Sequence, residues 1–136
     1  MRNQDSPPDF KSGIDAFMIR AAELQEAFFK QQAASGRPRG LRWKACDFGG
    51  DPKFAAEDSI GLTAWWGVTV SFEAIPGGPM EGVEAVSNLR AASAEFVQAA
   101  EGWQPVRVHF NLEPLEAITF ARENAGRNIQ ELPRND

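Results

Sequence analysis

The clearest pattern along the chain is an alternation of apolar and polar residues over positions 62–74. The even-numbered positions are apolar, and the odd-numbered positions are polar or small apart from Trp65. Successive side chains of a β-strand point to opposite faces of a sheet, so this period of two predicts a long strand with one buried face. Residues 106–112 alternate in the same way and predict a second such strand. Its polar face carries Arg107, His109 and Asn111.

Apolar residues at helical spacing predict three helices. The first covers about 13–34 and ends where a proline and two glycines follow. The second covers 86–100. The third begins at Pro114, which suits the first turn of a helix, and ends at Gly126.

These elements together predict an α+β fold. Two shorter apolar segments, 41–48 and 80–85, are also consistent with strands, so we expect a sheet of three or four strands. Strands with one polar face are typical of antiparallel sheets. We therefore expect a two-layer sandwich, in which a mostly antiparallel sheet has one face covered by about three helices.

The length indicates a single domain, and the composition of the two ends indicates polar tails. A chain of 136 residues is long enough to bury one hydrophobic core. Residues 1–9 are polar and contain two prolines, and residues 127–136 are largely polar. We expect both segments to be tails that flank an α+β domain over 10–126.

The scarcity of reactive side chains excludes several kinds of site. The chain has one cysteine, Cys46, one histidine, His109, and no tyrosine. No intrachain disulfide can form, and a zinc site of thiolates and imidazoles would lack ligands. We expect neither a metal site nor a cofactor. A free cysteine is most often buried, so we expect Cys46 in the core.

The sequence also bears on the compartment. No apolar segment approaches the 18 or so residues that a transmembrane helix needs, and the first residues lack the apolar stretch of a signal peptide. With a single cysteine, nothing favours an oxidising compartment. We therefore expect a cytoplasmic protein with no membrane partner.

The polar face of the two clearest strands is the most informative feature for function. If both strands lie in one sheet, this face collects an indole, an imidazole, a carboxylate, a guanidinium and several hydroxyl or amide groups. The candidate binding residues on it are Trp65, Thr69, Ser71, Arg107 and Asn111. Such a face is either simply solvated, or an interface with a protein or a second copy, or a small-molecule site.

The first functional hypothesis is a noncatalytic binding or self-association module that uses this open sheet face. No catalytic or cofactor motif is present, and ten phenylalanines and four tryptophans supply abundant apolar surface. The expected partner is a second copy or another protein, and a small-molecule ligand is the alternative.

A different hypothesis makes the protein a small hydrolase, isomerase or lyase. In this hypothesis His109 acts as a general base and Glu73 orients its imidazole ring on the open face. It requires the two side chains to lie within hydrogen-bonding reach of each other or of a common point.

A third hypothesis is a weak nucleic-acid contact through residues 37–44. This segment combines four basic residues with Trp43, and proteins that bind single strands pair basic grooves with aromatic stacking surfaces. The net charge of −5 argues against it, and the run also suits an edge strand whose basic side chains discourage aggregation.

Overall fold

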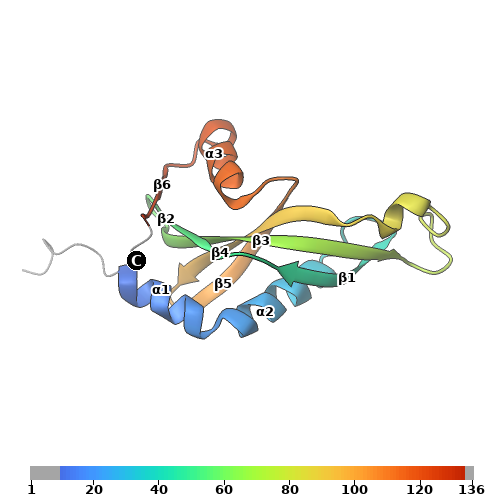
Figure 1. Cartoon of the computed structure of the whole chain (residues 1–136), viewed down its shortest axis with the longest axis horizontal. Coiled ribbons are helices and arrows are strands. Elements are labelled where there is room, and N and C mark those ends of the chain that lie inside the picture. Colours follow the sequence, from blue (N-terminus) through green and yellow to red (C-terminus); the bar gives the residue numbers. More distant parts are fainter. Residues whose placement is uncertain (1–9, 134–136) are drawn as a thin grey trace, which may run out of the picture.

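The computed structural model describes residues 10–133, which form an antiparallel sheet with helices on both faces (Figure 1). The helices are α1 (Phe10–Ile19), α2 (Ala21–Ala34) and α3 (Pro114–Ala125), together with a short 3-10 helix, η2 (Glu84–Ser87). The strands are β1 (Leu41–Phe48), β2 (Lys53–Glu57), β3 (Gly61–Ala74), β4 (Arg90–Ala99), β5 (Gly102–Phe110) and β6 (Ile129–Glu131). The predicted α+β class is confirmed.

The sheet is organised around β3, its longest strand. The strand order is β5-β4-β3-β2-β6, and β1 also pairs with β3. β1 pairs with the second half of β3 and β2 with the first half, so β1 and β2 act as one interrupted strand. The described chain contains six strands rather than the expected three or four, because β2, β4 and β6 were not predicted and the candidate strand over 80–85 does not form.

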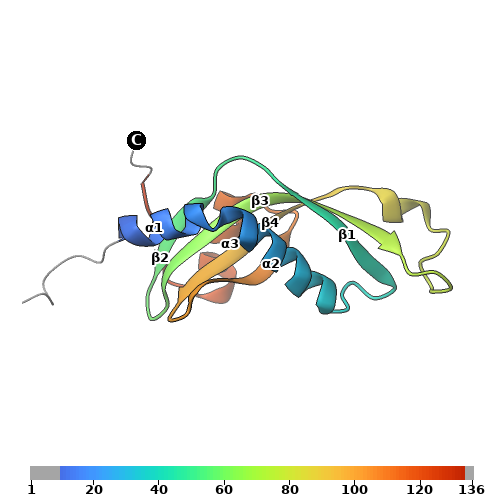
Figure 2. The same cartoon turned by 90° about the horizontal axis from the view of Figure 1, so that it is seen from below.

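The main core lies between the sheet and the two N-terminal helices, which run along one face (Figure 2). The even-numbered side chains of β3 point into this core. Phe17 of α1 is at its centre: its ring centroid lies 4.9–5.7 Å from the rings of four other aromatic residues. They are Phe54, Trp66, Phe96 and Trp103. Aromatic contacts of this kind add to the stability gained by burial.

The first predicted helix is in fact two helices that meet at Arg20. The backbone of Arg20 leaves helical geometry at φ −97° and ψ 12°. Its guanidinium Nη1 donates a hydrogen bond to the carbonyl of Trp103 at 3.2 Å, and the indole of Trp103 donates to the carbonyl of Gly13 at 2.8 Å. These tertiary contacts place α1 and α2 along the sheet as separate segments, which helical spacing alone does not predict.

α3 lies on the other face of the sheet, so the expectation that the helices share one face is wrong. It begins at Pro114 behind a capping box formed by Glu113 and Glu116, and ends at Gly126, whose φ of 65° suits glycine. Its buried residues pack over Trp65 in a second apolar cluster. None of the helices in residues 10–133 has the length and apolar character needed to cross a bilayer.

The helix predicted over 86–100 is also wrong, because residues 90–99 form β4. Both neighbours of β4 in the sheet pair with it over most of its length. Alternate side chains such as Ala94 and Phe96 face the main core, while Glu95 points to the opposite face. Alanine fits either conformation, so strand pairing decides the outcome here. Residues 80–85, a weak strand candidate, form turns and the start of η2.

The chain after α3 takes part in the fold, although a polar tail was expected over 127–136. Residues 129–131 form β6, which pairs antiparallel with β2. The amide of Leu132 extends this pairing by donating to the carbonyl of Phe54 at 2.9 Å. The expected N-terminal tail, residues 1–9, lies outside the described residues, as do residues 134–136.

The central position of Phe17 leads to a stability prediction. Phe17→Ala removes a fully buried ring from among four aromatic neighbours, and we expect it to lower the free energy of unfolding by about 3–5 kcal/mol. Phe120→Ala removes a ring that is half exposed on α3, and we expect a loss below about 1 kcal/mol. Urea unfolding followed by tryptophan fluorescence measures both. Equal losses in the two variants would contradict this description of the core.

Candidate functional site

Strand pairing brings the polar residues of the second face into one row. Trp65 of β3 is paired with Glu95 of β4, which is paired with Arg107 of β5. His109 lies two residues further along β5, so its side chain emerges on the same face as Arg107. Three strands therefore position an indole, a carboxylate, a guanidinium and an imidazole side by side.

This part of the face is closed rather than open. Trp65 is fully buried and packs against Ala117 and Ile118 of α3 and Ile129 of β6. Its indole N–H donates to the hydroxyl of Thr63 at 3.0 Å. Trp65 is therefore part of the second core cluster, and its ring is not available to a ligand at the surface.

Arg127 closes the site by bridging two buried carboxylates. Its Nε and Nη2 donate to Glu57 of β2 at 2.9 and 2.7 Å, and its Nη1 donates to Glu95 at 3.2 Å. Nη2 also donates to the second oxygen of Glu95. The guanidinium carbon lies 5.3 Å from the centroid of the Trp65 ring, within the range of a cation–π contact. Arg127 thus ties the end of α3 to β2 and β4.

His109 completes this arrangement from β5. Its Nε2 lies 2.8 Å from Oε1 of Glu95, and its ring centroid lies 5.3 Å from that of Trp65. Arg107 donates to the same oxygen of Glu95 at 3.1 Å. The side chain of Glu95 is only 2% exposed, yet its oxygens accept hydrogen bonds from three residues. We call Glu57, Glu95, Arg107, His109 and Arg127 the ion network.

The electrostatics of the ion network favour the charged forms of Glu95 and Arg127. Burial by itself would raise the pKa of Glu95, but hydrogen bonds from His109 and Arg127 and the charges of Arg127 and Arg107 lower that pKa to about 2. The hydrogen bond to Glu57 is the largest effect that raises the pKa of Arg127. Since Glu95 is ionised at neutral pH, Nε2 of His109 carries the hydrogen of their bond.

An imidazole held by a carboxylate is an arrangement that general bases use. The neighbouring hydroxyl groups, however, are committed elsewhere. Ser93 donates to the carbonyl of Leu112 at 2.7 Å, Thr63 donates to the carbonyl of Ala55 at 3.2 Å, and both side chains are fully buried. The visible role of the ion network is to fix α3 on the sheet.

The structure does not bring Glu73 to His109. Ser93 is the β4 partner of both Gly67 and His109, so Glu73 lies six residues along β3 from the level of His109, roughly 20 Å away along the strand. Glu73 instead accepts a hydrogen bond from Arg42 of β1 at 2.9 Å. The carboxylate beside His109 is Glu95.

The remaining candidate binding residues are spread over different surroundings. Ser71 lies opposite Ala45 of β1 and donates weakly to its carbonyl at 3.5 Å, and Thr69 lies opposite Asp47. Asn111 is exposed, with a φ of 66°, in the turn between β5 and α3. These residues do not converge with Trp65 and Arg107 on one point.

Three residues of the ion network were missed by the sequence reasoning. Glu95 lies in a segment interpreted as a helix, Arg127 in one interpreted as a tail, and Glu57 in one interpreted as a loop. One feature of the sequence could have identified Glu95: in residues 90–99, it is the single carboxylate and lies between alanines and a phenylalanine that point inward. That pattern also fits an alternating strand with one charged residue on its outer face.

Two other candidate features are largely enclosed. Cys46 is half-buried against the main core, and burial, together with the charge of Asp47, raises the pKa of its thiol to about 12. Trp43 is buried, and its indole N–H donates to the carbonyl of Arg37 at 2.7 Å. In residues 37–44 the aromatic ring therefore lies inside, and the basic side chains have no stacking surface beside them.

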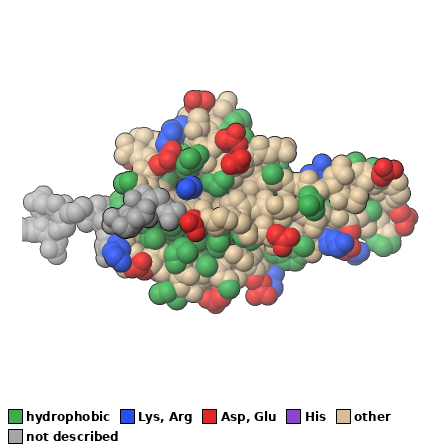
Figure 3. All heavy atoms as spheres, in the orientation of Figure 1, with side chains coloured by type: hydrophobic (Ala, Val, Ile, Leu, Met, Phe, Trp, Pro, Cys, Tyr) green, Lys and Arg blue, Asp and Glu red, His purple; other side chains and the backbone are tan. Residues whose placement is uncertain are grey.

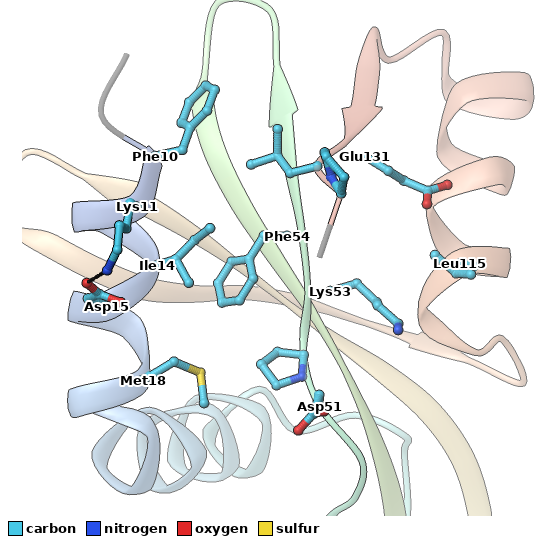
Figure 4. A pocket seen from close by; sticks show the side chains of 13 residues that line it. Phe10, Lys11, Ile14, Asp15, Met18, Asp51, Lys53, Phe54, Leu115 and Glu131 are labelled. Atoms are coloured by element: carbon cyan, nitrogen blue, oxygen red, sulfur yellow. Dashed lines mark hydrogen bonds and ion pairs between the residues drawn. The ribbon is translucent and has the colours of Figure 1, made fainter. Parts of the chain in front are cut away.

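The structure also contains an apolar groove that the sequence did not indicate. It has a volume of about 670 Å³ and lies between α1, β2, the start of α3 and the chain after β6 (Figure 4). Hydrophobic side chains gather on the surface around α1 (Figure 3). The apolar residues that line the groove are Phe10, Ile14, Met18, Pro52, Phe54, Leu115, Leu132 and Pro133.

Comparisons with protein-family models, with curated proteins and with solved structures found no match. Within residues 10–133, no three His, Cys, Asp or Glu side chains are grouped so that they could hold a metal ion.

The lowered pKa of Glu95 predicts a pH-dependent stability. The ionised carboxylate stabilises the folded state above its ordinary pKa of 4.5, and this contribution is lost as the pH falls towards about 2. We expect Glu95→Gln to be less stable than the parent protein at pH 7 by on the order of 3 kcal/mol. The difference should shrink between pH 4.5 and 2. Urea unfolding across this range measures it, with Glu123→Gln on the exposed side of α3 as the control. A difference that does not change with pH would contradict the assignment.

The bridging role of Arg127 leads to a separate prediction. Arg127→Met leaves two buried carboxylates without their main partner, so we expect a loss of about 3–5 kcal/mol in unfolding free energy. Adding Glu57→Gln and Glu95→Gln to that variant should recover part of the loss, because no buried charge is then unpaired. Arg39→Met, at an exposed position, is the matched control. A triple variant no more stable than Arg127→Met would show that charge pairing is not what Arg127 supplies.

Proposed function

We propose that the protein is a cytoplasmic, noncatalytic self-association module that joins a second copy of itself through β1. The observation that carries this proposal is the unpaired outer edge of β1. Among residues 10–133, β1 pairs with β3 and with no other strand, whereas the same side of β2 is occupied by β6. An unpaired strand presents a row of backbone donors and acceptors that another strand can use.

The opposite edge of the sheet, β5, is less suited to pairing. Pro105 in the middle of β5 has no N–H to donate. The carbonyl of Pro105 accepts a hydrogen bond from Gln31 at 3.0 Å, and that of Trp103 accepts one from Arg20 at 3.2 Å. Side chains of the N-terminal helices therefore already occupy this edge, and β1 is the better candidate.

The irregularity in β1 favours one particular register with a second copy. The pairing with β3 skips Lys44, which is a β-bulge. Because of the bulge, four side chains of β1 face the main core and three face the other side. The core-facing residues are Leu41, Trp43, Cys46 and Phe48, and the others are Arg42, Ala45 and Asp47.

A two-fold axis between Lys44 and Ala45 would place an antiparallel copy in a matching register. The pairs formed across the interface are Leu41 with Phe48, Arg42 with Asp47, Trp43 with Cys46, and Lys44 with Ala45. In the first three pairs both side chains lie on the same face, as antiparallel pairing requires. A shift of one residue in either direction would pair side chains from opposite faces.

Charge also supports this register. Arg42 of one copy would lie opposite Asp47 of the other, and the two-fold axis repeats the pair. Cross-strand pairs of opposite charge contribute roughly 0.2–1 kcal/mol each. Lys44 and the bulge would at the same time discourage pairing with unrelated strands. An interface built on one edge strand is small, so we expect a dimer that dissociates on dilution.

The test is the molar mass in solution as a function of concentration, measured by light scattering or sedimentation equilibrium. We expect a mass that rises from one copy towards two, and a shift towards one copy in Asp47→Lys, which places like charges opposite each other. Glu101→Lys makes the same charge change in the exposed β4–β5 turn and should leave the mass curve unchanged. A protein that stays monomeric at every concentration, or identical behaviour of the two variants, rules out the proposal.

The register itself can be tested by cross-linking. In a Cys46→Ala background, Arg42→Cys combined with Asp47→Cys should form disulfides between copies under mild oxidation, because the two positions face each other across the interface. Arg42→Cys combined with Glu101→Cys is the control and should yield far less cross-linked dimer. Equal yields from the two pairs would mean that the copies do not meet at β1 in this register.

A further inference from the structure

The groove beside α1 exists because β6 covers only part of β2. β6 pairs with Ala55, Ala56 and Glu57, and among residues 10–133 the hydrogen bond from Leu132 to Phe54 is the last along this edge. The first residues of β2 and the loop before it therefore border a space rather than another strand. α1 closes this space on one side and Leu115 of α3 borders it on the other (Figure 4).

The walls of the groove suit an apolar chain or ring. Ile14 and Phe54 point towards each other across the groove, with Phe10 towards one end and Met18 towards the other (Figure 4). The ring of Phe54 is held from behind by an edge contact with Phe17 at 5.4 Å, so this wall belongs to the main core. A volume of about 670 Å³ lies within the usual range for small-molecule sites.

Lys53 supplies the polar feature of the groove. Lys11 is paired with Asp15 at 2.9 Å, and Glu131 is paired with Arg122 at 3.6 Å. Lys53 lines the groove, and its ammonium has no hydrogen bond or ion pair with any described residue. Its side chain extends towards Leu115 (Figure 4). An ammonium beside an apolar surface is suited to an anionic group on an otherwise apolar molecule.

The other charges on the groove limit how much negative charge it accepts. Carboxylates of Asp15, Asp51 and Glu131 also border it. They would repel a phosphate or another multiply charged group, and they leave one favourable position, at Lys53. An ion pair at Lys53 therefore suits a group with a single negative charge and not a multiply charged one.

We infer that this groove binds a small amphipathic monocarboxylate, such as a medium-chain fatty acid. Lys53 is paired with Trp65 and Phe54 with Ala64, so these two side chains of β2 point to opposite faces of the sheet. The apolar chain lies along Ile14, Phe54 and Met18, passes the edge of β2 that β6 does not pair with, and places its carboxylate at Lys53 on the side of α3 (Figure 4). The flexible methionine lets the site accept chains of somewhat different shape. This site is separate from the edge of β1, so it does not depend on the proposed self-association.

The test uses calorimetric titration of the full chain with three ten-carbon probes below their micelle concentrations: decanoate, decanol and decylamine. We expect decanoate to bind about tenfold more tightly than decylamine. Lys53→Met should weaken decanoate binding about tenfold and leave decanol binding nearly unchanged, because the ion pair alone is lost. Lys30→Met, on the exposed side of α2, is the control and should bind like the parent protein.

A second variant tests the apolar part of the groove. Met18 is 46% exposed, so Met18→Trp should fold, which circular dichroism checks, and should fill the groove and reduce the binding of decanoate and decanol together. Three results would overturn the inference: no binding of decanoate, tighter binding of decylamine, or no effect of Lys53→Met. A fourth is binding that appears only when residues 1–9 or 134–136 are deleted, which would make the chain's own terminus the occupant.

Discussion

The structure depends on the pairing of Arg127 with two buried carboxylates. Glu57 and Glu95 come from strands on either side of β3, and each would be costly to bury alone. One guanidinium, with its five donors in a fixed plane, satisfies both and lies over Trp65. The ion network therefore holds the chain just after α3 against β2 and β4. Both the ion pairs of Arg127 and the apolar packing around Trp65 therefore hold α3 on the sheet.

The closure of this face decides which surfaces remain for function. A row of tryptophan, histidine, glutamate and arginine looks like a binding or catalytic surface when only the sequence is read. In the structure α3 covers Trp65, and the polar atoms of Glu95, His109 and Arg107 bond to one another, with Arg107 about half exposed. The outer edge of β1 and the groove at Lys53, whose ammonium has no hydrogen bond or ion pair with a described residue, lie outside this closed part.

The features that the sequence predicts well are those set by neighbouring residues. The alternation over 62–74 identifies β3, and Pro114 and Gly126 mark the two ends of α3, because a strand period, a first-turn proline and a left-handed glycine are local signals. β4 is not predicted, because alanine-rich sequence fits a helix or a strand until its neighbours pair with it. The ion network is not predicted for the same reason, because Arg127 bonds to Glu95 and Glu57, which lie 32 and 70 residues away in the chain.

The length of β3 links the closed and open parts of the molecule. Its first half has β2 and β4 beside it and helices above and below, which leaves room only for a packed interior with satisfied charges. Its pairing with β4 ends at Val70, so the last residues of β3 pair with β1 alone. The end of β1 comes near Pro114 at the start of α3, but β1 contributes no side chain to the ion network. A substitution at Asp47 can therefore alter self-association without removing a residue of the ion network. Self-association and the stability that the ion network supplies can then be measured separately in one protein.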